Sequence, residues 1–549
     1  MKSRTLFFNP AVFRKDITRF APLWGLYLVG MILLCVGGFF RTESDFDLAS
    51  VMGTTIGVFS IFNFGYALIC AELLFGDLFN ARLCNALHAM PLRRESWFFT
   101  HTISGILFSL IPNLIVGLLL IPQLGHYWFV SFIWVGGLTL GYLFFFGAAV
   151  LSAMCTGSRF SMVVVYGLIN FLSILIFGFL KGLYEPLMYG IHILIDEFLY
   201  FSPVSYLCST ELNFLNSLDK IAAALNPNNG WPYLVIISVV GVAMLIVALL
   251  AYRKRQLECA GDFITVRSMK PIFHVLYTLA AGIVLHLSQQ VFGIYDGYVF
   301  LIVGIVIGFL TGQMLLKRSL KVFTRPTFIG LAAVAVLLFG TMGLAKLDVL
   351  GIASYIPQVQ SVATLSIGNS YDAPPYTTSD ATEIEDLLTA HQLMLNNEEE
   401  DLNAPYPFDL RYTLTDGRTI SRRYLIDYNN ADADIVCKYL SKPEHVLQTD
   451  DVQALLQDVQ FVEIAIPTSA ASDSFLFFNE DADSFLQAVL ADCEAGTMAQ
   501  TWYAHEEDMH LGWVQLSLPN TYPYDCTFEI WSSAENCVAW MQEHNLYPN

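Results

Sequence analysis

Charged residues are scarce in this sequence. Only 14% of its 549 residues are Asp, Glu, Lys or Arg, whereas 55% are hydrophobic and the mean hydropathy is +0.53. A soluble protein of this length usually carries nearly twice that share of charge, so the composition favours integration into a membrane. The first apolar run lacks the features of a cleavable signal peptide, and we expect it to remain as a membrane span.

Sequence signatures of several kinds of chemistry are also missing. No G-x-x-x-x-G-K-[ST] motif occurs, so the chain cannot hold ATP through a P-loop. The zinc-peptidase motif H-E-x-x-H is approached only by HEEDMH, from His505 to His510, in which the histidines diverge by about 140° around a helix. Stretches beginning at Asp427 and Asp481 lack the Gly and Glu of a calcium loop. We therefore predict no catalytic residues, no metal site and no cofactor bound by this chain.

Basic residues are rare in the C-terminal part of the chain. Residues 1–345 hold 21 Lys and Arg against 15 Asp and Glu, whereas residues 346–549 hold 7 against 33. The imbalance separates a membrane half from an acidic half and argues against nucleic acid as a partner. A surface this acidic would suit a cationic peptide, although a merely solvated surface is the more common interpretation.

Six of the ten cysteines lie in the membrane half and show no metal-ligand spacing. Four others lie in the acidic half: Cys437, Cys493, Cys526 and Cys537. They are compatible with free thiols, or with one or two disulfides if that half is extracellular, and the sequence does not choose a pairing.

Nine apolar stretches are long enough to cross a bilayer as helices. They lie at about 20–40, 54–70, 97–121, 127–154, 161–180, 232–251, 272–290, 298–316 and 327–345. With a cytoplasmic N-terminus, the inner segments hold 18 basic residues and the outer loops hold three, which is the bias that membrane insertion follows. We predict an all-α polytopic membrane protein, N-terminus inside, with a C-terminal extracellular α+β domain. The segment of about 181–231 is expected to form a re-entrant or interfacial pair of short helices.

The acidic half has its own pattern of strands and helices. Alternation around Asp416-Gly417 predicts a β-hairpin, and further strands are expected at 459–466, 474–480, 510–518 and 526–532. Helices are expected at 382–401, 481–495 and 533–545. No internal repeat is evident. The expected domains are thus 1–255 with six spans, 256–345 with three more, and 346–549.

A short polar stretch with helical spacing separates the second and third spans. A continuous helix from Glu72 would give an apolar stripe and a polar stripe, consisting of Phe75, Phe79, Leu83 and Leu87, and of Asp77, Asn80, Cys84 and His88. The helix should end near Met90, because Pro91 disfavours the helical conformation of the residue before it. Arg93 and Arg94 would hold the next span at the cytoplasmic face.

This stretch resembles the loop between the second and third spans of ABC exporter permeases. The likeness lies in Glu72, Gly76 and LHAMPLRRE (Leu87 to Glu95), since in that family an acidic residue leads through a helix to a Pro-Leu/Ile-Ser/Arg-Arg turn. NPAVFRKDITRFAPLWGLYL, from Asn9 to Leu28, also resembles permeases common in Gram-positive bacteria. The resemblance covers about 1–255. The chain departs from it by three more spans and an acidic domain, so transport need not be its only role.

The resemblance implies a transport subunit of a bacterial plasma membrane, not an enzyme. Such permeases work as pairs, identical or different, and dock a cytoplasmic helix into a separate ATP-binding cassette subunit that uses ATP and Mg. The residues expected to couple the two subunits are Glu72, Leu87, His88, Met90, Pro91, Arg93 and Arg94. The alternative is a nine-span sensor whose outer domain binds a ligand. A membrane-embedded enzyme is disfavoured because no catalytic set is visible. The transported substrate could be a lipid, a peptide or a drug.

Polar side chains inside the predicted spans are costly to bury in lipid and therefore need an explanation. They are Asn63, Asn113, Asn170, His274, His286 and Gln313. Hydrogen bonds between helices are the favoured explanation. A substrate path through Asn63, Asn113 and Asn170 is the alternative.

Overall fold

The chain divides into two compact units. One comprises Met1–Leu183 and Leu194–Leu338, and the other comprises Tyr184–Ile193 and Phe339–Asn549. The structure is a computed structural model that describes residues 7–39, 45–89, 93–124, 128–193, 201–207, 230–256, 259–291, 298–368, 375–396, 407–425, 431–449, 451–467, 472–498, 509–517 and 526–546.

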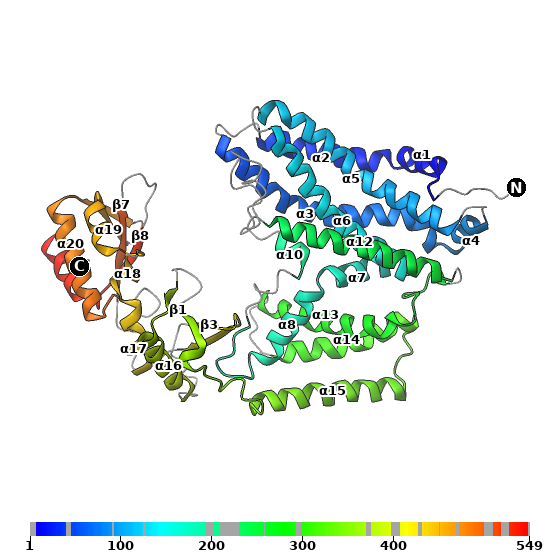
Figure 1. Ribbon diagram of the computed structural model, residues 1–549. Helices are drawn as coiled ribbons and strands as arrows, with labels where there is room; N and C mark the ends of the chain where they lie inside the picture. The colour runs from blue at the N-terminus through cyan, green and yellow to red at the C-terminus, as the bar shows by residue number, and fades with distance from the viewer. Residues whose placement is uncertain are drawn as a thin grey trace. The chain divides into compact units, whose positions relative to one another are not determined.

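The first unit is built of helices (Figure 1). They are α1 (Pro10–Arg19), α2 (Ala21–Phe39), α3 (Asp45–Phe75), η1 (Gly76–Phe79), α4 (Ala81–Ala89), α5 (Arg94–Leu124), α6 (Trp128–Cys155), α7 (Arg159–Asn170), α8 (Leu172–Tyr184), α10 (Pro203–Leu207), α12 (Trp231–Lys254), α13 (Met269–Val291), α14 (Val299–Lys317) and α15 (Arg325–Lys346). Among the described residues, seven helices are long and apolar enough to span a membrane, or nine if the bent pairs α1/α2 and α7/α8 each count as one. Every predicted span overlaps one of these helices or pairs.

Helix α6 lies at the centre of the first helix group and is buried along most of its length. It packs against α3, α5 and α12. The crossing with α12 is close, because a Cβ added to Gly147 would lie 2.3 Å from the carbonyl oxygen of Gly241. Small residues permit such contacts between membrane helices, where van der Waals packing replaces the hydrophobic effect as the driving force.

A second group joins α13 and α14 to α7 and α8. Val165 and Leu175 share a buried cluster with Phe263 and Phe273. Gly304 again permits close approach, since an added Cβ would lie 2.7 Å from the carbonyl oxygen of Ala281. Helices α13 and α14 are therefore packed onto α7 and α8 within one compact unit.

The fifth predicted span is broken rather than straight. Helices α7 and α8 meet at an angle of 66° around Phe171. The side-chain amide of Asn170 donates to the carbonyl of Tyr166 at 2.8 Å, and the hydroxyl of Ser202 donates to the carbonyl of Asn170 at 3.1 Å. The break leaves a backbone carbonyl without its helical partner, and a serine from the following segment satisfies it.

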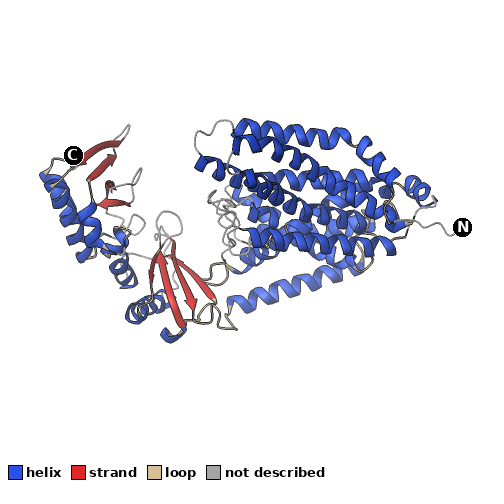
Figure 2. Cartoon of the chain, turned by 45° about the horizontal axis from the view of Figure 1, so that its top comes forward, coloured by secondary structure: helices blue, strands red, loops and turns tan. Residues whose placement is uncertain are grey.

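The second unit contains two four-stranded antiparallel sheets (Figure 2). The first module consists of β1 (Val362–Gly368), β2 (Tyr376–Thr378), α16 (Ala381–Asn396), β3 (Pro407–Leu414), β4 (Thr419–Leu425) and α17 (Ala431–Leu440), preceded by η5 (Val359–Ser361). The second module consists of β5 (Phe461–Pro467), β6 (Ser472–Phe477), α20 (Glu480–Ala495), β7 (His510–Ser517), β8 (Cys526–Trp531) and α21 (Glu535–Glu543). The short helices α18 (Pro443–Val446) and α19 (Val452–Asp458) connect them.

The two modules have the same topology. Each runs strand, strand, helix, strand, strand, helix, and the sheet orders β2-β1-β3-β4 and β6-β5-β7-β8 correspond one to one. Burial in the first helix of each also matches: Ile384, Leu387, Leu388, His391 and Met394 correspond in spacing to Ala482, Phe485, Leu486, Val489 and Asp492. The expectation of no internal repeat is therefore wrong for the topology. The sequence hides the repeat because a fold constrains which positions are buried more than which residues fill them.

The predicted strands and helices of the acidic half are confirmed. The hairpin of β3 and β4 turns at Gly417, whose φ of 84° lies in the left-handed region that glycine adopts without strain. Helix α20 begins after Asn479 and ends before Gly496, which has a φ of 78°. The helix predicted at 481–495 thus begins one residue later than α20 and ends at the same residue.

Residues Tyr184–Ile193 belong to the second unit although α8 precedes them. The backbone N–H of Arg423 donates to the carbonyl of Gly190 at 3.1 Å, and Ile191 forms an antiparallel bridge with Arg422. Gly190 is required there, because its φ is 72° and an added Cβ would lie 2.3 Å from the ring of Tyr424. The predicted pair of short interfacial helices is wrong for this part of the segment, since the free edge of β4 offers backbone partners. Residues 194–200 and 208–229 lie outside the described residues.

Candidate functional site

The connection between α3 and α5 is not the continuous helix that the sequence predicts. Helix α3 ends at Phe75, the 3₁₀ turn η1 follows, and α4 begins at Ala81. Asn80 between them has extended backbone angles, and its side chain accepts hydrogen bonds from the backbone N–H groups of Arg82 and Leu83. Asn80 thus acts as an N-cap that starts a new helix in a new phase.

The new phase changes which side of α4 is buried. Cys84, predicted on the polar stripe, is 2% exposed, whereas Leu83, predicted on the apolar stripe, is 51% exposed. Arg82 and Asn85 are exposed as well. The two-stripe prediction is therefore wrong, because it carried one helical phase through the break at Asn80. An apolar side chain with basic and amide neighbours on an exposed face is a feature of a docking surface.

A buried arginine fixes the base of this connection. Arg255, directly after α12, is 7% exposed, and its guanidinium donates to the carbonyls of Ala153 at 2.8 Å, Met154 at 3.3 Å and Leu78 at 3.1 Å. The first two carbonyls lie at the C-terminal end of α6, where a cation also meets the negative end of the helix dipole. Arg255 therefore joins η1, α6 and α12. The sequence gives no sign of this role, since basic residues after a span also serve as ordinary anchors.

Two ion pairs and a further hydrogen bond surround Arg255. Glu72 lies 3.3 Å from Arg159 at the start of α7, and Glu95 lies 3.2 Å from Arg253. The guanidinium of Arg94 donates to the carbonyl of Arg255 at 3.1 Å. These contacts hold the ends of α3, α5, α7 and α12 together around the start of α4. The surface ion pairs are individually weak, so the buried Arg255 contributes most of the rigidity.

The predicted coupling residues that the structure describes lie in two places, around Arg255 at the base of the connection and in the last turn of α4. Glu72 and Arg94 belong to the network just described, and Arg93 is exposed directly before α5. Leu87 and His88 lie in the last turn of α4, whereas Met90 and Pro91 lie outside the described residues. The described groups make no acid–base or nucleophilic set.

Two of the three asparagines proposed for a substrate path meet in the structure. The hydroxyl of Tyr27 lies 3.1 Å from Oδ1 of Asn63 and 3.2 Å from Oδ1 of Asn113. Asn63 also donates to the carbonyl of Leu138 at 3.3 Å. Both asparagines are buried, and the contacts join α2, α3, α5 and α6, as expected for hydrogen bonds between helices. Asn170 belongs instead to the break between α7 and α8.

A buried acidic residue was missed by the sequence reasoning. Asp16 in α1 is 3% exposed and lies 2.8 Å from Nδ1 of His101 in α5. The hydroxyl of Ser104 donates to the same carboxylate at 2.9 Å. The residue could not be distinguished in the sequence from other charged residues before the first span. Its contacts fasten α1 along α5.

The remaining polar residues of the predicted spans have local partners. His274 lies 2.9 Å from the carbonyl oxygen of Phe309, and Nδ1 of His286 lies 3.0 Å from the amide of Gln289. The first contact joins α13 to α14.

In the part of the chain that the structure describes, no group of three or more His, Cys, Asp or Glu could hold a metal ion. His505 lies outside the described residues, and His510 begins strand β7 rather than lying on a helix. Cys437, Cys493, Cys526 and Cys537 are not in disulfides.

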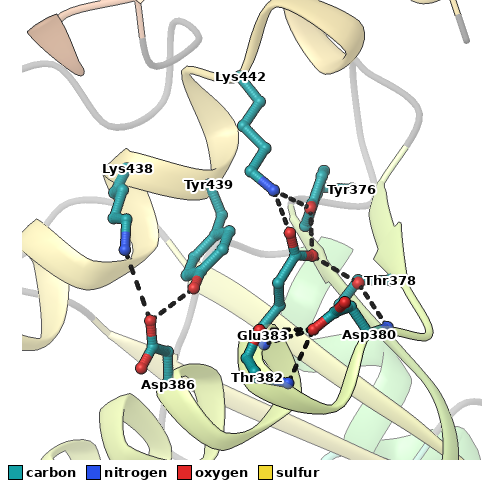
Figure 3. A network of polar contacts seen from close by, with 9 residues as sticks. All are labelled: Tyr376, Thr378, Asp380, Thr382, Glu383, Asp386, Lys438, Tyr439 and Lys442. Atoms are coloured by element: carbon teal, nitrogen blue, oxygen red, sulfur yellow. Dashed lines mark hydrogen bonds and ion pairs between the residues drawn. The ribbon is translucent and has the colours of Figure 1, made fainter. Parts of the chain in front are cut away.

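A polar network closes the first module (Figure 3). Lys442, after α17, forms an ion pair with Glu383 in the first turn of α16 and donates to the hydroxyl of Tyr376 at 2.8 Å. Burial disfavours the charged form of Glu383, but hydrogen bonds from Lys442, Thr378 and Tyr376 outweigh it, so the pKa of this carboxyl lies below its ordinary value. These side chains satisfy one another's hydrogen bonds and join α16 and the end of α17 to β2.

The same module contains a buried histidine. His391 is fully buried, with Nε2 lying 2.7 Å from the hydroxyl of Tyr424 and Nδ1 lying 2.8 Å from the hydroxyl of Tyr412. Burial, and then the charge of Arg422, lower the pKa of His391 to about 3. The imidazole is therefore neutral at physiological pH, and both ring nitrogens have partners.

Comparison with protein-family models, curated proteins and solved structures finds no match to this chain. The geometry of the connection between α3 and α5 is therefore the main guide to function.

Proposed function

We propose that the chain is the permease subunit of an ATP-driven exporter, coupled to a separate ATPase subunit through α4. The observation that carries the proposal is the position of α4: a short helix between two apolar helices, with Cys84 buried and Leu83 half exposed. The resemblance of Glu72 and LHAMPLRRE to exporter permeases supports the same role.

The network around Arg255 suggests how coupling would work. A force on α4 reaches η1, whose Leu78 carbonyl is held by the same guanidinium that holds the end of α6. Since α6 packs against α3, α5 and α12, a displacement there would tilt several helices as a group. Rigid elements that slide together are the usual basis of shear motions.

The proposal includes the partners and the setting. Two permease chains would pair in a bacterial plasma membrane, with lipid around them and the N-terminus in the cytoplasm. The second unit would then be extracellular. The bias of 18 basic residues against three supports this direction, because positive charge is retained on the cytoplasmic side. Protease added to intact cells should remove the acidic half and spare the N-terminus.

The test is a charge placed on α4, at the exposed Leu83 or at Leu87 in the last turn of the helix. Leu83→Glu and Leu87→Glu would bury an unpaired carboxylate in the docking cleft, and we expect ATPase binding to weaken by a factor of about ten or more. Leu320→Glu is the matched control: Leu320 is 78% exposed and belongs to another predicted cytoplasmic segment, so binding should not change.

The experiment uses the ATPase encoded next to this chain, if that gene carries a P-loop. Binding and stimulated ATP turnover are measured in nanodiscs after expression and pairing are confirmed. Wild-type coupling in both α4 variants would show that α4 only closes a loop. A histidine kinase in place of the ATPase gene would favour the sensor alternative.

A further inference from the structure

The second module carries charge of only one sign. No Lys or Arg follows Lys442, and residues 443–549 hold 18 Asp and Glu. The negative electrostatic potential of this region therefore attracts cations and repels anionic surfaces. Net charge by itself does not identify a binding site.

Helices α20 and α21 pack on one face of the second sheet. Val462, Val514 and Phe528 point into a core that is completed by Phe485 of α20 and Trp540 of α21. The alternate residues of the same strands point the opposite way. On β7 and β8, these alternate residues include Trp513 and Glu529, which are cross-strand partners, and Trp531.

A β-bulge adds His510 to this face. The register of β7 against β8 shifts between His510 and Gly512, so Leu511 is buried while His510 and Trp513, three residues apart, share a side. The bulge needs glycine, because a Cβ on Gly512 would lie 2.6 Å from the carbonyl oxygen of Ala465. Bulges commonly redirect a side chain next to a functional site.

The four side chains are in direct contact. The indole N–H of Trp513 donates to Oε1 of Glu529 at 2.9 Å, and the imidazole ring of His510 lies 4.5 Å from the indole of Trp513 and 5.1 Å from that of Trp531, centroid to centroid. Nε2 of His510 lies 3.4 Å from Oε2 of Glu529. Trp513 is 42% exposed, so a large part of its indole is accessible.

Three polar atoms in this cluster lack hydrogen-bond partners among the described residues. They are Oε2 of Glu529, Nε1 of Trp531 and Nε2 of His510. Unsatisfied buried polar atoms are uncommon in native proteins and call for an explanation. Two of these atoms, Oε2 of Glu529 and Nε2 of His510, face each other at 3.4 Å, beyond hydrogen-bond geometry, so the carboxylate lies unneutralised beside the exposed ring of Trp513.

We propose that this face, formed by His510, Trp513, Glu529 and Trp531, binds a cationic peptide. A Lys or Arg side chain lies against the exposed indole of Trp513 and beside the carboxylate of Glu529, whose side chain is 20% exposed, since cations are attracted to indole faces and to carboxylates. A bilayer is a poorer occupant, because anionic lipid would be repelled by residues 443–549, which hold 18 acidic residues and no Lys or Arg. The proposal is independent of export.

The test measures binding of a labelled hexalysine peptide to the full chain in an uncharged maltoside micelle. Glu529→Gln and Trp513→Ala should each weaken binding by about tenfold. Glu535→Gln removes the same charge from an exposed position in the first turn of α21, and Leu476→Ala removes an apolar side chain, 53% exposed, from the same face. Both controls should bind within about twofold of wild type, since they leave the cluster intact.

Three results would overturn the proposal. The first is absence of hexalysine binding to the wild type at low salt. The second is equal weakening by Glu535→Gln and Glu529→Gln, which would mean diffuse attraction by the acidic surface. The third is displacement of hexalysine by phosphocholine, which would assign the cluster to a lipid headgroup. No ATPase or transport enters the assay, so its outcome does not depend on the proposed function.

Discussion

The two modules of the acidic half share one topology but are stabilised by different polar groups. Both fold two hairpins, each followed by a helix, into a sheet with the same strand order. At the buried positions of the first helix, the first module has His391 and Met394 where the second has Val489 and Asp492. The shared topology therefore depends on which positions are buried, whereas the buried polar residues and their hydrogen-bond partners differ between the two modules.

In each module, one contact joins the end of the second helix to the start of the first helix, and the residues that make this contact differ between the modules. Lys442 pairs with Glu383 and lies 5.2 Å and 5.0 Å from the ring centroids of Tyr376 and Tyr439. In the second module His544 lies 3.9 Å from Asp481 and contacts the rings of Phe477 and Trp540. Both contacts connect the end of the second helix to the first turn of the first helix. A lysine is always charged in this setting, whereas a histidine is charged only when protonated.

The modules also differ in charge. Residues 346–442 hold all seven Lys and Arg of the acidic half with 15 Asp and Glu, whereas residues 443–549 hold none with 18. The same topology therefore carries two different surfaces, one with charged residues of both signs and one with acidic residues and no Lys or Arg. Surface charge does not determine a fold, so one of the two surfaces could be adapted to a ligand without loss of structure.

The largest effect on stability is expected from exchanging the residue types at one equivalent buried position of the two modules, which is Met394 in α16 and Asp492 in α20. Asp492 is 1% exposed and accepts hydrogen bonds from the backbone and side-chain N–H groups of Asn536 and from the backbone of Cys537. Asp492→Met should destabilise the second module by about 3 kcal/mol or more, because the start of α21 loses its cap. Met394→Asp should cost as much in the first module, since it buries an unpaired carboxylate.

Urea unfolding of the full chain, followed by protease resistance of the acidic half, measures this effect. Glu494→Met is the matched control, since Glu494 lies exposed on the same helix, and it should change stability by less than about 0.5 kcal/mol. An Asp492→Met variant as stable as this control would contradict the assigned cap.

The next effect concerns acid stability of the first module. His391 in the unfolded chain binds a proton below its ordinary pKa of 6.5, whereas the folded pKa of about 3 keeps it neutral. Stability should therefore be complete above pH 6.5 and fall as the pH drops toward 3, by about 1.4 kcal/mol per pH unit. His391→Gln cannot titrate and should remove this slope.

His445 adds a second slope of the same sign. Burial lowers the pKa of His445 to about 4, so it too resists protonation only while folded. Unfolding at pH 7, 6 and 5 in wild type, His391→Gln and His445→Gln separates the two contributions. Parallel pH profiles for wild type and His391→Gln would disprove the role given to the buried imidazole.

The smallest effect is expected from exchanging the closing residues. Lys442→His should weaken the first contact and His544→Lys should strengthen the second, each by no more than about 1 kcal/mol, because these groups are partly solvated. Added salt should reduce both changes. The same urea assay at two salt concentrations measures them, and Lys438→His is the control because Lys438 is more exposed and pairs with Asp386 outside the closing contact. Identical stabilities for Lys442→His and wild type would show that the apolar ring contacts alone close the module.

Local pattern was sufficient to predict most elements. Nine apolar runs each correspond to a helix or a bent pair, and the alternation around Asp416-Gly417 corresponds to β3 and β4. The helix predicted at 481–495 corresponds to α20, which ends before Gly496. These features depend on neighbours in sequence, either on apolar length or on the backbone freedom of one glycine.

Contacts between distant segments decided the rest. The sequence around Asn80 permits a continuous helix, and only the structure shows the restart that exposes Leu83 and buries Cys84. Arg255 is one of several basic residues after a span, and its role depends on carbonyls at Leu78, Ala153 and Met154. The cluster of His510, Trp513, Glu529 and Trp531 requires a bulge and the pairing of β7 with β8. Composition and periodicity determined the membrane half, the acidic half and their elements, because each depends on local burial. The sites depend on which backbone groups meet across the fold, and that is decided by packing.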